Sequence, residues 1–156
     1  MQLGNTKDYA NPATLVPTGS CAKFPIAMAP VKSGSDDGSF GKSNQFKNND
    51  FYRYDHPGGH ISLSLSYTKP SSGGADLDLY LYKPNFVFGS SDNMAGFSNS
   101  ESDRSPDDPS KGLEIISTDL PAGTYMINVM AYTGVAAGSA TNYTMSLNGN
   151  AVCPQY

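Results

Sequence analysis

The sequence contains no tryptophan and only two histidines and two cysteines, and charged residues make up 15% of its 156 positions. It has no long apolar run, so it offers no segment of the kind that spans a membrane. Its first residues lack the basic flank and apolar core of a signal peptide. The net charge of −4 and the scattered lysines and arginines provide no basic patch for nucleic acid. We therefore expect neither a nucleic-acid partner nor a membrane span.

The short motifs that mark common hydrolases are also missing. The sequence contains neither G-x-S-x-G nor H-E-x-x-H. Pro-Gly-Gly between His56 and His60 excludes the helical spacing of a zinc pair, so both are interpreted as ordinary surface histidines. Only Glu101 and Glu114 are available as glutamates for glycoside hydrolysis. We therefore expect no enzyme; a small hydrolase would be supported by His56 or His60 lying in a pocket, within hydrogen-bond reach of a serine or carboxylate.

Turn-forming residues are abundant, with 16 glycines and 11 prolines. Between them lie segments in which apolar and polar residues alternate, as in strands with one buried face. Ile61, Leu63 and Leu65 alternate with serines, and a second such segment reads DLDLYLY. Further strands are expected around 24–28, 50–56, 113–120, 124–132 and 142–149. About seven or eight strands predict an all-β fold, an antiparallel β-sandwich of jelly-roll or Greek-key type with very little helix.

The chain is long enough for one domain with its own hydrophobic core. Residues 1–22 show no period of two or 3.6, and we interpret them as a linker or N-terminal extension. Residues 23–156 then form a single β-sandwich domain. Within it, residues 89–112 are rich in Ser, Asp and Pro, which predicts a long surface excursion.

Cys21 and Cys153 lie near opposite ends of the sequence and have no histidine or second cysteine at metal-ligand spacing. A disulfide between them is the economical interpretation, and two buried free thiols are the alternative. A disulfide implies an oxidising compartment, and therefore a secreted or extracellular protein.

Several segments, in order, resemble the pre-peptidase C-terminal domain of bacterial secreted proteases, a family related to the collagen-binding domains of collagenases. They are the strand pair DFYRYDHPGG and HISLSLSY, then GGADLDLYLY, LPAGTYMINVMAY and NYTMSLNG. The family shows an Asp-x-Tyr-x-Phe strand, an Asp-Leu-Asp-Leu-Tyr-Leu strand and a Leu-x-Ala-Gly-Thr-Tyr strand before a closing Tyr-Thr-Leu strand. The resemblance covers residues 48–149.

The resemblance implies a non-catalytic accessory domain of a secreted peptidase or other hydrolase. Such a domain aids export and maturation, or binds an insoluble substrate such as a collagen-like protein or a polysaccharide. Its partner would be the catalytic domain of the parent peptidase, and its location extracellular. The alternative is a structural extracellular module of an adhesin or filament.

Some members of that family bind calcium, which takes about six to eight oxygen ligands. Asp36, Asp37, Asn48 and Asp50 can converge on Ca²⁺ if the turn between them folds back. Family members with calcium carry a Glu-x-Asn-Asp-like segment ahead of the first strand, whereas residues 10–35 here contain no glutamate. The alternative is that these are turn and surface residues.

Two other acidic groups are rival candidates for the same ion. One is the pair at strand spacing in DLDLYLY, and the other lies in the 89–112 segment: Asp76 and Asp78, and Glu101, Asp103, Asp107 and Asp108.

Ten tyrosines suggest a binding surface, and Tyr80 and Tyr82 project from the strand face opposite the leucines. Exposed rigid aromatic rings on a flat sheet suit a fibrous protein or polysaccharide, because they bury a large area at low entropic cost. The alternative is that both rings pack beneath the 89–112 segment with their hydroxyls satisfied.

Overall fold

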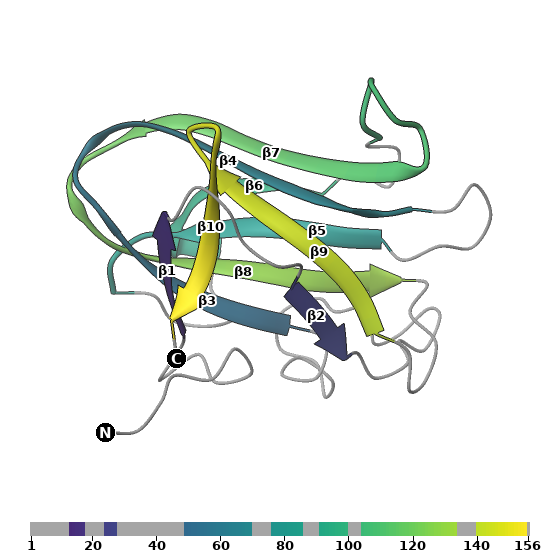
Figure 1. The fold of residues 1–156 in the computed structure, drawn as a ribbon. Helices are drawn as coiled ribbons and strands as arrows, with labels where there is room; N and C mark the ends of the chain where they lie inside the picture. Colours follow the sequence, from purple (N-terminus) through teal and green to yellow (C-terminus); the bar gives the residue numbers. More distant parts are fainter. Residues whose placement is uncertain are drawn as a thin grey trace.

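The computed structural model describes residues 13–17, 24–27, 49–69, 76–85, 91–99, 104–133 and 140–155. In this part of the chain there are ten β-strands and one 3-10 helix of three residues, η1 (Ser91–Asn93). No helix in these ranges has the length and apolar character needed to cross a membrane. The predicted all-β sandwich is confirmed (Figure 1).

The first layer is a five-stranded sheet. Its strands pair in the order β6 (Met94–Ser98), β5 (Asp76–Tyr82), β8 (Gly123–Thr133), β3 (Asn49–His56) and β1 (Ala13–Pro17). All neighbours in it are antiparallel except β1 and β3, which are parallel.

The second layer has β7, β4 and β9 as neighbours, with β2 at the outer side of β9. The bounds are β7 (Lys111–Leu120), β4 (Gly59–Thr68), β9 (Ala140–Leu147) and β2 (Phe24–Ala27). The last strand, β10 (Asn150–Gln155), pairs first with β9 and then with β1, so it links the two layers along one side (Figure 1).

The core lies between the layers, where the alternating apolar residues of both sheets meet. Each fully buried aliphatic or aromatic side chain contributes roughly 1.5–3 kcal/mol relative to an exposed one. The fully buried members of this core include Ile61, Leu63 and Leu65 of β4, Leu77, Leu79 and Leu81 of β5, and Ile127 and Val129 of β8. The strict alternation in the sequence therefore encodes the inner faces of β4 and β5.

Two short turns at one end carry the chain between the layers. Pro57 and Gly58 join β3 to β4, and Pro121 and Ala122 join β7 to β8. Gly58 has a φ of 96°, and a Cβ atom on it would lie 3.2 Å from the backbone nitrogen of Ala122. Glycine is needed at this position because the backbone is left-handed and the second turn lies against it.

On the side opposite β10, the edge strands β6 and β7 of the two layers meet. The Ser98 hydroxyl accepts a hydrogen bond from the Ile115 amide at 3.3 Å and donates one to the buried Glu114 carboxylate at 2.5 Å. A Cβ atom on Gly96 would lie 2.6 Å from Cγ2 of Ile116, so glycine permits this close approach. These contacts close the sandwich along that side.

Two segments differ from the sequence prediction. The predicted linker or extension over 1–22 contains β1, and the predicted surface excursion over 89–112 contains η1 and β6. Neither strand shows clear alternation: β1 reads ATLVP and β6 reads MAGFS. β1 pairs with β3 and β10, which are distant in sequence, and β6 pairs with the preceding strand β5. Both are defined by this pairing, which a local pattern does not report.

Candidate functional site

The outer face of the β7-β4-β9 layer carries a row of hydroxyl groups on each of two strands and aliphatic side chains on the third. We call it the serine face. It consists of Ser62, Ser64 and Ser66 of β4, Leu113, Ile115 and Ser117 of β7, and Thr144 and Ser146 of β9. These residues are outward because their sequence neighbours form the inner face of the same strands.

Strand register places the serine face in rows across the three strands. Ser64 pairs with Ile115 on one side and with Ser146 on the other, and the two serine Oγ atoms lie 2.6 Å apart. Ser66 pairs in the same way with Leu113 and Thr144. Neighbouring strands lie roughly 4.8 Å apart, and alternate residues along a strand roughly 6.8 Å apart. The face is thus a regular array of hydroxyls beside a column of aliphatic groups.

Ile115 is 50% exposed on this face, although it is a large hydrophobic residue. In the described part of the chain the other exposed large hydrophobic side chain is Phe97, at 58%. Phe97 lies on β6, in the layer that does not carry the serine face, and pairs there with Tyr80 of β5. With the partly exposed Leu113 two residues away on β7, Ile115 forms a short aliphatic strip, and we take this face as a candidate contact surface.

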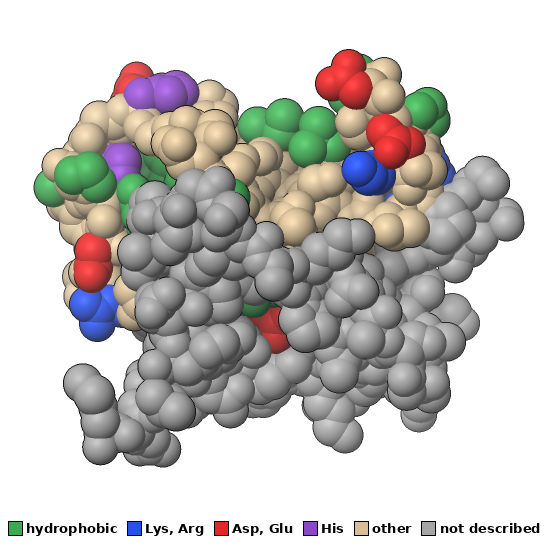
Figure 2. All heavy atoms as spheres, viewed as in Figure 1, with side chains coloured by type: hydrophobic (Ala, Val, Ile, Leu, Met, Phe, Trp, Pro, Cys, Tyr) green, Lys and Arg blue, Asp and Glu red, His purple; other side chains and the backbone are tan. Residues whose placement is uncertain are grey.

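Among the residues that the structure describes, charge is confined to the two ends of the serine face. Lys111 and Asp108, whose charged atoms lie 3.6 Å apart, stand at one end, and His60 and Asp119 stand at the other. Figure 2 shows hydrophobic side chains gathered between an end with histidine and acidic groups and an end with acidic and basic groups. The surface dips between these two ends in the same view. The central part of the face is therefore uncharged.

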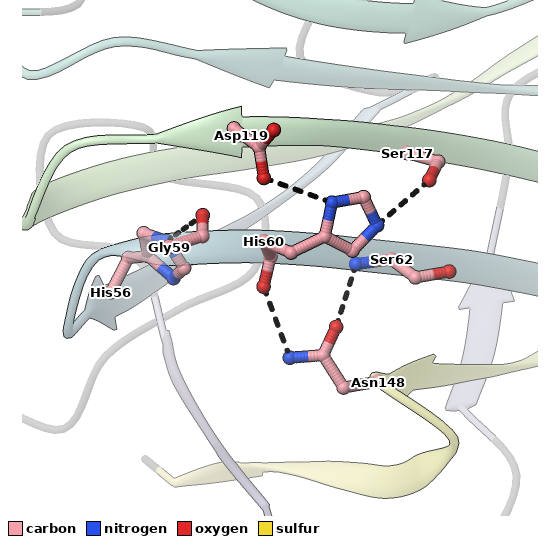
Figure 3. A network of polar contacts seen from close by, with 7 residues as sticks. All are labelled: His56, Gly59, His60, Ser62, Ser117, Asp119 and Asn148. Carbon is pink, nitrogen blue, oxygen red and sulfur yellow. Dashed lines mark hydrogen bonds and ion pairs between the residues drawn. The ribbon is translucent and has the colours of Figure 1, made fainter.

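The histidine end is an ordered polar network (Figure 3). His60 Nδ1 lies 3.1 Å from an Asp119 carboxylate oxygen, and Nε2 lies 3.1 Å from Ser117 Oγ. The Asn148 side chain accepts a hydrogen bond from the Ser62 amide at 2.7 Å and donates to the His60 carbonyl at 3.4 Å. Asn148 thereby fixes the backbone on which His60 stands.

The two histidines occupy different environments. His60 is exposed, as predicted, but His56 is buried, and its interpretation as a surface residue was wrong. The His56 ring lies between Tyr54 and Tyr125, with ring centroids 5.8 and 5.9 Å away, and its Nε2 lies 3.2 Å from the Gly59 carbonyl. The Pro57-Gly58 turn brings it inward, so His56 belongs to the packing of that end.

Tyr80 and Tyr82 are buried, so the exposure on which their predicted role as binding anchors rested is absent. Their exposed fractions are 7% and 0%, and the two rings stack with centroids 6.4 Å apart. They pack with Met130 on the outer side of the first layer. Burial is the main cause that raises the pKa of both phenols, with the nearby Asp78 charge adding to it at Tyr80. A polar alternate position on a strand was mistaken for a solvent-facing one.

Of the four predicted calcium ligands, Asp36, Asp37 and Asn48 lie outside the described residues. Asp50 is in β3 and is 2% exposed, and its carboxylate accepts a hydrogen bond of 2.9 Å from the Tyr143 hydroxyl. Burial and the Asp50 charge raise the pKa of Tyr143. No group of three potential metal-ligating side chains occurs in the described ranges. Calcium binding stays a prediction.

The rival acidic groups have other partners. The Asp76 carboxylate pairs with Lys69 at 2.5 Å, and Asp78 accepts a hydrogen bond from Tyr80 at 3.2 Å. A shift of register between Asp76 and Leu77 turns these two carboxylates to different surroundings. In the other group, Asp108 accepts from the Ser110 amide and hydroxyl and Asp107 is exposed, whereas Glu101 and Asp103 lie outside the described residues.

The predicted disulfide is not placed by the described residues. Cys21 lies outside them, and Cys153 is in β10 but its side chain is outside the described set. The disulfide stays a prediction.

No known family model matches the chain, and no curated protein matches it. Among solved structures, it is similar to the pre-peptidase C-terminal domain of a collagenase from Bacillus anthracis, with a TM-score of 0.44 and 12% identity over 88% of this chain and 90% of that one. It is also similar to Xyl-CBM35 in complex with a glucuronic acid-containing disaccharide, with a TM-score of 0.44 and 16% identity over 92% and 99% of the two chains.

A family 35 carbohydrate-binding module from Cellvibrio japonicus Abf62 shows the same degree of similarity. Its TM-score is 0.43, with 12% identity over 91% of this chain and 98% of that one. The neighbours thus include the domain type that the sequence resembles. Similarity at this level leaves function to be argued from the residues of this chain.

The serine face and the His60 network were not predicted from the sequence. Ser62, Ser64 and Ser66 were recognised only as the polar half of an alternating strand. Ser117 and Asp119 lie 57 and 59 residues from His60, and their contact depends on the register between β4 and β7. The usable signal was the run of three serines at alternate positions of one strand.

Proposed function

We propose that this chain is a non-catalytic accessory domain of a secreted hydrolase, and that it binds a neutral insoluble polysaccharide through the serine face. The observation that carries the proposal is the pairing of an aliphatic column with two hydroxyl columns on an uncharged, regularly spaced face. The similarity to solved structures is not part of this support.

A sugar chain has the complementary chemistry. Each pyranose ring presents apolar C–H groups on its faces and hydroxyl groups around its rim. Leu113 and Ile115 offer aliphatic contact to the C–H groups. Ser64 and Ser146, with Oγ atoms 2.6 Å apart, retain capacity to donate and accept further hydrogen bonds at the rim.

The charge distribution favours a neutral polymer over a charged one. The chain has a net charge of −4, and the charged groups near the serine face, including Lys111 and Asp119, stand at its ends. A polyanion would gain little attraction here, and its charges would meet the protein's own negative field. An uncharged face also avoids the cost of desolvating ions when a polymer covers it.

The experiment is co-sedimentation of the purified protein with insoluble cellulose, chitin and xylan, compared for the wild type and Ile115→Asn. We expect binding to at least one polymer, and about a tenfold loss of affinity in the variant, equivalent to about 1.4 kcal/mol. The matched control is Phe97→Asn, which removes a hydrophobic side chain of similar exposure from the other layer and should leave binding unchanged.

A second variant, Ser64→Val with Ser146→Val, tests the hydroxyl columns without changing the strand. It should also weaken binding, since the polar groups of the sugar lose their partners. Equal losses in Ile115→Asn and Phe97→Asn would contradict the assignment of the face. Binding to fibrillar collagen and to none of the polysaccharides would overturn the substrate class.

A further inference from the structure

His60, Ser117 and Asp119 form a hydrogen-bonded series at one end of the serine face (Figure 3). His60 and Asp119 are directly paired across β4 and β7, and Ser117 lies two residues from Asp119 on β7. Alternate residues on a strand point to the same side of the sheet, so both β7 side chains reach the same ring. The two contacts to the imidazole nitrogens are each 3.1 Å.

The chemistry of the two partners fixes the tautomer of the neutral His60 ring. The Asp119 carboxylate can only accept a hydrogen bond, so Nδ1 must carry the ring hydrogen. Nε2 then presents its lone pair to the Ser117 hydroxyl, which donates to it. The opposite tautomer would direct a lone pair at the carboxylate oxygen. The serine proton therefore already points at a base that is oriented by a third group.

The sheet holds this arrangement in place from both sides. The β4–β7 ladder runs through His60 and Asp119 without a shift of register. On the other side of β4, Asn148 binds the amide of Ser62 and the carbonyl of His60. The base and the hydroxyl are thus carried on paired strands and not on a loop.

We propose that Ser117 is an activated nucleophile that accepts an acyl group from small activated esters. Ser117 Oγ attacks the ester carbonyl while its proton passes to His60 Nε2. The bond between the acyl carbon and the alcohol oxygen then breaks, and the leaving alcohol takes the proton from His60. The product is an acyl-serine, and no oxidant or further reactant is required.

The exposure of the three side chains allows this reaction without an enclosed site. The His60 and Asp119 side chains are 58% and 85% exposed, and Ser117 is exposed between them. A small ester can therefore reach Oγ from solvent. The proposal does not depend on polysaccharide binding, which uses the central part of the face.

The experiment is incubation of the protein with p-nitrophenyl acetate, followed by measurement of released p-nitrophenolate and by peptide mass spectrometry. We expect acetylation of Ser117 in preference to the other serines of the face. Loss of the general base in His60→Ala should slow it by roughly a hundredfold or more. Asp119→Ala, which frees the tautomer, should slow it by a smaller factor.

Ser110→Ala is the matched control, since Ser110 is an exposed serine outside the serine face whose hydroxyl donates to the Asp108 carboxylate at 2.6 Å instead of to an imidazole. This variant should acetylate at the wild-type rate, and circular dichroism should show each variant folded. Acetylation of Ser117 at the same rate in His60→Ala would overturn the proposal. So would a stable adduct that survives in Ser117→Ala.

Discussion

Lys69 and Asp76 form an ion pair inside the protein. Their charged atoms lie 2.5 Å apart, and the two side chains are almost fully buried. The Tyr67 hydroxyl donates to the same carboxylate at 3.4 Å, and burial is the main cause that raises the pKa of this phenol. A buried charge that loses its partner keeps its desolvation penalty, so this pair is a sensitive point in the fold.

We expect Lys69→Met to reduce the free energy of unfolding by about 3–5 kcal/mol, because it leaves the Asp76 carboxylate buried without its cation. Urea denaturation measures this loss. The double variant Lys69→Met with Asp76→Leu should recover most of it, since both charges are then absent. Lys111→Met removes an exposed partner of Asp108 and should leave stability nearly unchanged. A double variant no more stable than Lys69→Met would contradict this account.

For single residues, the sequence predicted which strand face a side chain occupies more reliably than whether that side chain is exposed. Tyr80 and Tyr82 were correctly placed opposite the leucines of β5, but that side of the strand is buried. An alternating pattern indicates that the two faces of a strand differ in polarity, but it does not indicate that one of them is exposed to solvent. His60 became interesting only when register placed Ser117 beside it, 57 residues away in sequence.

Strand β9 ends at Leu147, and Asn148 follows it directly in the turn. The backbone of Asn148 has an unusual conformation. Its φ of 49° is left-handed, a conformation that asparagine tolerates, and Gly149 follows with a φ of 79°. The backbone amide of Asn148 donates to the Ser62 carbonyl at 2.8 Å, and the Asn148 side chain accepts from the Ser62 amide. Asn148 thus continues the hydrogen bonding of β9 to β4 by one residue, after the backbone of β9 has turned away from β4.

We expect Asn148→Gly to lower the free energy of unfolding by about 1 kcal/mol, through loss of the side-chain hydrogen bonds to Ser62 and His60. Asn148→Ala should lose about 1 kcal/mol more, because it adds the strain of a left-handed residue with a Cβ. Thermal and chemical unfolding of both variants separate the two contributions. Equal stability of Asn148→Gly and the wild type would show that the side-chain bonds contribute nothing.

The strands that the sequence predicted share a clear alternation of apolar and polar residues, as in β4, β5, β7 and β8. The strands that it missed do not: β1, β6 and β10 are short, and β10 contains a proline and a cysteine. β1 and β10 pair with each other from opposite ends of the sequence, whereas β6 pairs with β5, the strand that precedes it. Their formation is a consequence of tertiary pairing, which a local pattern cannot express.

For the whole molecule, the tyrosines are the most informative residue type. All seven tyrosines whose side chains are described are buried: Tyr52, Tyr54, Tyr67, Tyr80, Tyr82, Tyr125 and Tyr143. Burial raises the pKa of Tyr54, Tyr67, Tyr80, Tyr82 and Tyr143 above the ordinary value. A phenol whose pKa is higher in the folded chain favours folding only while the unfolded chain keeps it protonated.

We therefore expect full stability below about pH 10, the pKa of a tyrosine in an unfolded chain, and a loss as the pH rises toward the folded values. In that pH range the tyrosine hydroxyls lose their protons in the unfolded chain, whereas the buried hydroxyls of the folded chain keep theirs. Tyrosinate absorbance of these five tyrosines should rise together with the loss of circular dichroism, in one cooperative step. An early rise in absorbance that accounts for most tyrosines, with the fold intact, would contradict their burial.

The calcium site and the Cys21–Cys153 disulfide stay predictions at this scale. Of the residues in question, Asp50 alone has a described side chain, and it is engaged by Tyr143 inside the sandwich. Sequence composition correctly indicated the class of fold and the near-absence of helix. The location of the serine face required the register of three strands.

Strand β1 lies between β3 and β10, parallel to the first and antiparallel to the second. Thr14, for example, pairs with Arg53 on one side and Gln155 on the other. Without β1, both neighbours would present unpaired amides and carbonyls, and such edges are templates for association with a second copy of the chain. By occupying the backbone hydrogen-bonding groups of both neighbours, this five-residue strand protects the fold against edge-to-edge aggregation.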